Sequence, residues 1–125
     1  MAKILIVDDS PTIAAVFKRL FVRAGHDVSV ASDGNSGLSA AQQQHPDLVV
    51  LDNMLPGMNG FDICRVLKGD ATLKSTKVLL LTGSQDEASV KEGKQAGADA
   101  YLTKDCGIAR VIEAAGHLLG NGSAI

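Results

Sequence analysis

Five short apolar segments recur along the chain at intervals of similar length. Three of them, with the sequences Ile-Leu-Ile-Val, Leu-Val-Val-Leu and Val-Leu-Leu-Leu, contain apolar residues only. Continuous apolar runs of this length are typical of strands that are buried on both faces of a parallel sheet. The five predicted strands span residues 3–7, 27–31, 47–51, 77–81 and 99–102.

The stretches between these segments show the periodicity of amphipathic helices. In the first stretch Ser10 can cap a helix and Pro11 can occupy its first position. Apolar residues then recur at 13, 16, 17 and 20, and Gly25 is suited to end the helix. The other four helices are predicted over residues 35–45, from residue 60, from a capping box at 84–87 to residue 97, and over 108–119.

Five alternations of strand and helix predict an α/β domain in which helices cover both faces of a doubly wound, parallel sheet. Right-handed crossovers place ligand chemistry in the crevice at the carboxyl ends of such strands. The 125 residues are enough for one domain. That domain is expected over residues 1–120, with residues 121–125 as a short flexible tail or the start of a linker.

Composition excludes several classes of protein. Twelve basic against fourteen acidic residues give a net charge of −2, which argues against nucleic acid as the main partner. The apolar runs fall short of the roughly 20 residues of a membrane span, and the first residues lack the order of a signal peptide. A cytoplasmic protein is therefore expected, with Cys64 and Cys106 as reduced thiols.

Polar side chains stand where the predicted strands end. They are Asp8 and Asp9 after the first strand, Asp52 after the third, Thr82 after the fourth and Lys104 after the fifth. Any one of them could be an ordinary polar residue at the start of a loop. Because the carboxyl ends of parallel strands lie at one edge of a sheet, we expect all five to line a single crevice.

The charges of this set indicate the chemistry of the crevice. Two carboxylates about 4 Å apart repel each other by about 4 kcal/mol at an effective dielectric constant near 20. Three carboxylates together therefore require a cation between them if all are to stay ionised. Oxygen ligands suit Mg²⁺, which accepts a phosphate oxygen among its ligands, and Lys104 adds a charge aimed at phosphate. The sequence predicts a site for Mg²⁺ and a phosphoryl group.

These motifs resemble the receiver domain of response regulators. The resemblance is carried by Ile-Leu-Ile-Val-Asp-Asp-Ser at residues 4–10 and by Leu-Asp-Asn-Met-Leu-Pro-Gly-Met-Asn-Gly at residues 51–60. Thr-Gly after the fourth strand and Lys after the fifth complete the set, and the match covers essentially the whole chain. The resemblance, which is to chemotaxis-like receivers, implies a (βα)5 fold with strand order 2-1-3-4-5.

The resemblance also implies a role for each residue of the site. Asp52 resembles the phosphoacceptor, and Lys104 the lysine that binds the phosphoryl group. Asp9, Asp52 and the backbone carbonyl of Met54 resemble direct Mg²⁺ ligands, while Asp8 is expected to act on the metal mainly through water. The phosphodonor would be a phosphohistidine of a sensor histidine kinase, a phosphotransfer protein or a small phosphodonor.

A conformational switch is implied as well. Thr82 resembles the switch hydroxyl and Tyr101 the switch aromatic, although Tyr101 could instead be an ordinary edge-strand residue. The fourth helix carries few apolar residues and an interior Gly93, which costs roughly 1 kcal/mol relative to alanine, so we expect it to move. The surface of the fourth helix, fifth strand and fifth helix would then control a downstream partner, an output domain or a phosphorylation-dependent dimer.

Two other functions compete with this interpretation. Phosphatases of the haloacid dehalogenase type also use an aspartate nucleophile, but they have a second Asp two residues later, where this chain has Met54. The chain is thus expected to be a phosphoacceptor that catalyses only its own phosphoryl transfer and loss. A binding module with the receiver fold that no longer uses phosphorylation is the second alternative, and the intact five-residue site argues against it.

Two positions depart from the family pattern. Gly83 stands where alanine is usual, which leaves access to Asp52 open. Asp105 stands where many relatives have proline, often after a cis peptide bond. A non-proline cis bond costs about 2.5–4 kcal/mol. We therefore expect either a trans Lys104–Asp105 bond with a shifted loop or a strained cis bond, and Asp105 could cap the fifth helix.

Overall fold

The five predicted strands form one parallel sheet in the computed structural model, which describes residues 2–53, 55, 57–83 and 87–120. The strands are β1 (Lys3–Val7), β2 (Asp27–Ala31), β3 (Leu48–Asp52), β4 (Lys77–Thr82) and β5 (Ala100–Thr103). Their order is β2-β1-β3-β4-β5, and each neighbouring pair is parallel. The predicted fold class and strand order are confirmed.

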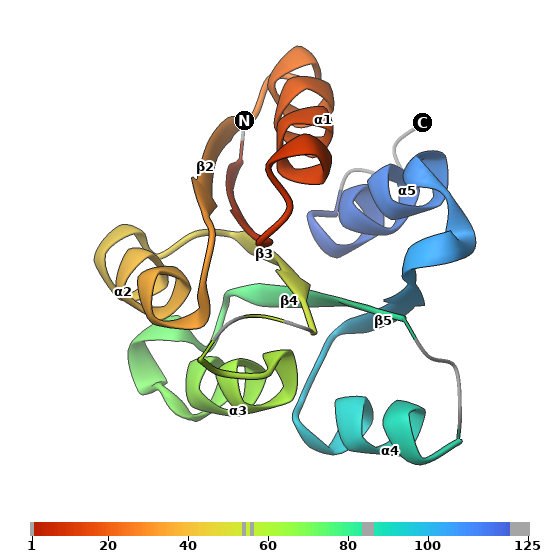
Figure 1. Ribbon diagram of the computed structural model, residues 1–125. Coiled ribbons are helices and arrows are strands. Elements are labelled where there is room, and N and C mark those ends of the chain that lie inside the picture. Colours follow the sequence, from red (N-terminus) through yellow and green to blue (C-terminus); the bar gives the residue numbers. More distant parts are fainter. Residues whose placement is uncertain (1, 54, 56, 84–86, 121–125) are drawn as a thin grey trace.

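Helices cover both faces of this sheet (Figure 1). They are α1 (Pro11–Arg23), α2 (Gly34–Gln44), α3 (Gly60–Gly69), α4 (Glu87–Gln95) and α5 (Ile108–Leu118), with short 3₁₀ turns η1 (Ala71–Leu73) and η2 (Lys104–Cys106). Residues of α1 and α5 pack into one apolar cluster on the sheet, and residues of α2 and α3 pack into the other. Two separate cores therefore sandwich the strands.

The alternation along β1 explains why its run is continuously apolar. Leu5 and Val7 belong to the cluster under α2 and α3, whereas Ile4 and Ile6 belong to the cluster under α1 and α5. All four side chains are buried. A strand in the middle of such a sheet has no solvent-facing side, so every position of β1 after the exposed Lys3 is apolar.

Local signals set most helix boundaries. Ser10 Oγ accepts a hydrogen bond from Ile13 N at the start of α1, and Gly25 follows that helix with φ +95°. The second helix starts one residue earlier than predicted, because Asp33 caps it by accepting from Ser36 N at 2.7 Å. The expected capping-box residues 84–86 lie outside the described residues.

The start of α5 differs from the sequence-based alternative. Its N-cap is Gly107, at φ +93°, and the side chain of Asp105 does not cap the helix. Asp105, in η2, instead accepts a hydrogen bond from Oγ1 of Thr103, the last residue of β5. The Lys104–Asp105 peptide bond is trans, so the strained cis alternative is wrong. Within the described part of the chain, the helices are too short or too polar to span a membrane.

Candidate functional site

The sheet brings the five predicted site residues to its carboxyl edge. Asp8 and Asp9 directly follow β1, and Lys104 directly follows β5, as expected. Asp52 and Thr82 are the last residues of β3 and β4 rather than the first residues of loops. The ladder continues through both positions, because Asp52 pairs with Leu81 and Thr82 pairs with Thr103.

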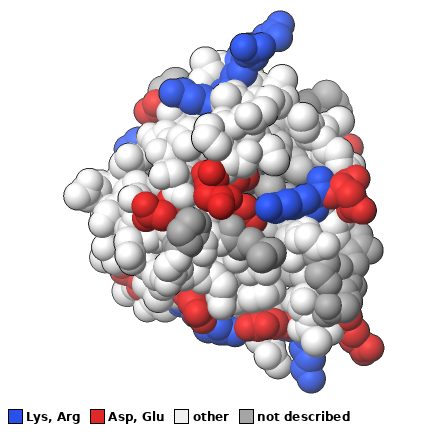
Figure 2. All heavy atoms as spheres, viewed as in Figure 1, with Lys and Arg blue, Asp and Glu red and all other residues white. Residues whose placement is uncertain are grey.

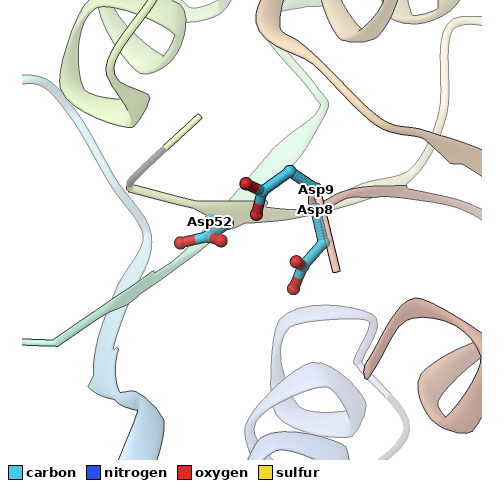
Figure 3. Close-up of side chains that lie close together, drawn as sticks. All are labelled: Asp8, Asp9 and Asp52. Carbon is cyan, nitrogen blue, oxygen red and sulfur yellow. The ribbon is translucent and has the colours of Figure 1, made fainter. Parts of the chain in front are cut away.

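Three carboxylates converge at this edge (Figure 3). Asp8, Asp9 and Asp52 each place an oxygen atom within 4.8 Å of the others. Asp8 and Asp52 are buried, at 4% and 1% exposure, while Asp9 is exposed. Figure 2 shows acidic side chains gathered in the middle of this face beside a basic one. The group therefore has a closed side formed by the sheet and an open side facing solvent.

Burial makes the charge of Asp8 costly. Desolvation raises the pKa of this carboxyl above its usual value, and the negative charges of Asp52 and Asp9 raise it further. A hydrogen bond of 2.8 Å from Ser10 N and the positive charge of Lys104 act in the opposite direction. The net effect is a raised pKa, so any additional positive charge placed beside Asp8 would stabilise its ionised form.

Lys104 holds the buried carboxylate of Asp52. Its Nζ atom lies 2.9 Å from Oδ1 and 3.0 Å from Oδ2 of Asp52. The carboxylate side chain is fully buried, whereas the lysine side chain is 38% exposed. The ammonium group thus compensates Asp52 from the solvent side, where an incoming anionic group would also meet it.

The donor set fits a hard divalent cation. Three carboxylates, two of them buried, supply oxygen ligands and an excess of negative charge at one point, and both features favour Mg²⁺ over softer metals. The expected third ligand, the backbone carbonyl of Met54, lies outside the described residues.

Glycine allows the loop after β3 to close beside Asp52. A Cβ at Gly60 would lie 2.7 Å from Asn53 Cα and 2.8 Å from the backbone oxygen of Asp52. Gly60 N donates a hydrogen bond of 2.8 Å to Asn53 O. The start of α3 is therefore packed directly onto the backbone of the site, which accounts for the glycine at the end of the loop motif.

Two features near the site were not found from the sequence. Asn53 has a buried Oδ1 atom without a hydrogen-bond partner among the residues that the structure describes. A cavity of about 220 Å³ between α1 and α5 reaches Asp8 and Lys104. Its other lining residues include Ile13, Val16, Phe17, Leu81, Ile108 and Val111. The helical periodicity assigned these side chains to the core, but only the packing of α1 against α5 shows the space left between them.

The proposed switch residues occupy neighbouring strands. Thr82 is buried at the end of β4, and Tyr101 is partly buried in β5, where it packs on the core cluster under α3. The ring of Tyr101 lies directly against Gly93 of α4. Thr82 thus lies on the strand between Asp52 of β3 and β5, and Tyr101 lies on β5 itself.

A comparison with models of protein families shows to which family the chain belongs. The model of the response regulator receiver domain matches residues 4–116. The chain belongs to the response regulator receiver family. The receiver resemblance drawn from the sequence motifs is confirmed.

Curated relatives of this receiver include proteins of two lengths. "Protein PilH" of Pseudomonas aeruginosa is 41% identical over 104 residues, which cover 83% of this chain and 86% of PilH. "DNA-binding response regulator MtrA" of Mycolicibacterium smegmatis is 42% identical over 102 residues, which cover 82% of this chain and 43% of MtrA. The chain therefore spans less than half the length of the MtrA proteins and matches most of PilH.

Solved receiver structures have the same fold. Chemotaxis response regulator CheY4 of Vibrio cholerae has a TM-score of 0.88 and 30% identity, covering 94% of this chain and 98% of that chain. The Francisella response regulator 1452 receiver domain also has a TM-score of 0.88 and 30% identity, covering 96% and 98%. Receivers act in phosphorylation-mediated signalling with histidine kinases or phosphotransfer proteins, and they typically bind Mg²⁺ at an acidic cluster such as the one formed here.

Proposed function

We propose that this receiver accepts a phosphoryl group on Asp52, in a reaction that depends on Mg²⁺, and thereby switches a partner or an output domain. The observation that carries this proposal is the environment of Asp52. Its buried carboxylate is bound by Lys104 at 2.9 Å and lies within 4.8 Å of two further carboxylates. A carboxylate with a cation on one side and a ligand set on the other suits attack on an anionic phosphorus centre.

The reaction would be an in-line displacement. An oxygen of Asp52 forms a bond to phosphorus while the bond from phosphorus to the imidazole nitrogen of a phosphohistidine breaks, and the nitrogen keeps the electron pair. Lys104 is positioned to move from the carboxylate to the oxygens of the transferring group. Small phosphodonors would react in the same way, because the site contributes positioning and charge rather than donor recognition.

The acidic residues would hold the cation. Mg²⁺ would be bound directly by Asp9, Asp52 and the backbone carbonyl of Met54, and by Asp8 mainly through water. The bound cation would supply positive charge to the oxygens of the transferring group. Asp8 supports this assignment because its buried carboxyl has a raised pKa that nearby positive charge would relieve.

The signal would then pass to the surface of α4, β5 and α5. Shifting a two-state equilibrium from 1:99 to 99:1 needs about 5.5 kcal/mol. A hydrogen bond from the Thr82 hydroxyl to a charged phosphoryl oxygen supplies about 1.5–3 kcal/mol. The remainder must come from the contact of Lys104 and from rearranged loops, with Tyr101 filling the space that Thr82 vacates.

The proposed output surface contains a hollow of suitable size for a partner side chain. A pocket of about 480 Å³ lies between α4, β5 and α5. Its lining residues are Val90, Lys94, Tyr101, Leu102, Thr103, Cys106 and Arg110. Because Tyr101 is one of these, a change in its ring position would change the shape of the pocket. MtrA is named as a DNA-binding regulator, whereas for this chain the output remains a partner protein or a further domain.

Mass spectrometry tests the proposal. The protein is incubated with acetyl phosphate in Mg²⁺ and, separately, in EDTA. We expect an acid-stable, base-labile phosphoryl adduct that requires Mg²⁺ and is lost in Asp52→Ala. Asp27→Ala serves as the control, because Asp27 is an exposed carboxylate at the opposite end of the sheet.

Each other outcome selects a different function. Absence of an adduct in the folded wild-type protein would favour a binding module that does not use phosphorylation. Continuous release of phosphate at enzyme-like rates would favour a phosphatase. An adduct that persists in Asp52→Ala would place the phosphoacceptor elsewhere in the chain.

A further inference from the structure

The contact between α4 and β5 depends on a glycine. Gly93 is buried in α4, and a Cβ at this position would lie 2.5 Å from Cδ2 and 2.8 Å from Cε2 of Tyr101. It would also lie 3.5 Å from Cε1 of Phe61. Both approaches to the tyrosine are closer than any that real Cβ atoms make. The ring therefore occupies a place that exists only because residue 93 has no side chain.

The core leaves the ring little room to yield inward, whereas on its outer side the ring lines the hollow between α4, β5 and α5. Phe61 is buried in the core on the α3 side. The helix itself is tied to α3 by the Arg65–Glu92 ion pair, at 3.1 Å, and by a hydrogen bond from Cys64 Sγ to Ala96 O at 3.4 Å. A side chain at residue 93 would thus have to expel the ring or push α4 outward, and packed interiors resist both changes.

We propose that Gly93 is the positioning residue for Tyr101. Because residue 93 has no side chain, the tyrosine ring packs against the backbone of α4 in a partly buried position, and any side chain at residue 93 would displace the ring. The glycine that looked like a weak point in a mobile helix thus has a packing role. The consequence for signalling depends on the proposed function of Tyr101, but the positioning itself is a property of the unphosphorylated protein.

Intrinsic fluorescence reports on this residue alone. The chain contains one tyrosine and no tryptophan, so all tyrosine emission comes from Tyr101. We would measure acrylamide quenching of this emission in the wild-type protein, Gly93→Ala and Gly69→Ala. Gly69 is the matched control, because it is also a helical glycine but a Cβ there would meet nothing within 4 Å.

The expected result is specific to the Gly93 substitution. In Gly93→Ala the quenching constant rises toward that of free N-acetyltyrosinamide, while Gly69→Ala keeps the wild-type value and far-UV circular dichroism shows both variants folded. Equal quenching in all three folded proteins would overturn the proposal. If Gly93→Ala does not fold, the double variant Gly93→Ala/Tyr101→Ala decides: recovery of folding supports the proposal, and failure to recover contradicts it.

A second measurement separates this inference from the proposed function. Mg²⁺ and beryllofluoride, an analogue of the phosphoryl group, are added to the wild-type protein and to Gly93→Ala. We expect quenching to change in the wild-type protein and to stay at its raised value in Gly93→Ala. If quenching in the wild-type protein does not change although Asp52 forms its phosphoryl adduct, Tyr101 is not the switch. The quenching of Gly93→Ala in metal-free buffer still tests whether Gly93 positions the ring of Tyr101.

Discussion

Replacing Asp8 by asparagine is expected to stabilise the metal-free protein. The pKa of Asp8 is raised in the folded state, chiefly by burial, so ionising this carboxyl costs folding free energy. The cost is absent below the unfolded pKa of 3.8, appears as the pH rises through the folded pKa, and is complete above it. Asparagine removes the charge and keeps an oxygen that can accept the hydrogen bond from Ser10 N.

The magnitude combines the desolvation of Asp8 with the repulsion between the carboxylates. Two unit charges separated by 4.8 Å, the limit within which these oxygens lie, repel by about 3.5 kcal/mol at an effective dielectric constant near 20. Lys104 neutralises part of this repulsion through its ion pair with Asp52, and solvent screens the exposed Asp9. We therefore expect Asp8→Asn to gain about 1–2 kcal/mol, which raises the Tm by about 4–8 °C for a domain of this size.

Thermal unfolding followed by circular dichroism at neutral pH and low salt measures this effect. In EDTA, Asp8→Asn is expected to melt above the wild-type protein, and the gap should close as the pH approaches 3.8. Excess Mg²⁺ should raise the Tm of the wild-type protein more than that of the variant, because only the former keeps the full set of charges. Asp27→Asn controls for a loss of surface charge.

Two outcomes would contradict the reasoning. If Asp8→Asn melts at or below the wild-type temperature in EDTA, burial and the neighbouring carboxylates do not make the charge of Asp8 costly in the folded protein. If Mg²⁺ raises both melting temperatures equally, the negative charge of Asp8 contributes nothing to cation binding.

Three further predictions concern other parts of the molecule. Gly60→Ala should lower the free energy of unfolding by about 1–3 kcal/mol in a urea titration, because its Cβ would meet the backbone of Asn53 at 2.7 Å. Burial raises the pKa of the Cys64 thiol to about 11, so Ellman's reagent should titrate Cys106 in the native protein and Cys64 after unfolding. We expect the apolar side chain of Met54 to hinder water from attacking the phosphoryl group, so Met54→Asp or Met54→Asn should shorten the lifetime of the adduct, and an unchanged rate of loss would refute this role.

The positions of β1, β3 and β4 were predictable because burial on both faces leaves a continuous apolar signal. The prediction matched β1 and β2 residue by residue, while β3 starts one residue later than expected. Asp47 stays outside β3, and its Oδ2 atom accepts a hydrogen bond from Lys3 N. Polarity marked Asp52 as the end of its strand, but the ladder of hydrogen bonds extends to it. Residue type thus located the ends of the strands to within one residue, and hydrogen-bond pairing with the neighbouring strand fixed their final positions.

The start of α5 and the role of Gly93 were not predictable in this way. Asp105 has the residue type of an N-cap, yet it lies within η2, and Gly107 is the N-cap of α5. Helix propensity counts Gly93 as a weakness, since propensity describes an isolated helix. Neither residue type nor helix propensity takes account of the neighbouring strand, whose Tyr101 ring occupies the space beside Gly93.

The amino-acid sequence by itself determined which residues converge at the carboxyl edge of the sheet, because polar residues mark the ends of buried parallel strands and those ends meet at one edge. Only the tertiary structure decided how the residues stand there: Asp52 buried and bound by Lys104, 52 positions away, and Asp8 too buried to be charged without cost. Distances and desolvation depend on the packing of segments remote in sequence, and local residue patterns carry no measure of that packing.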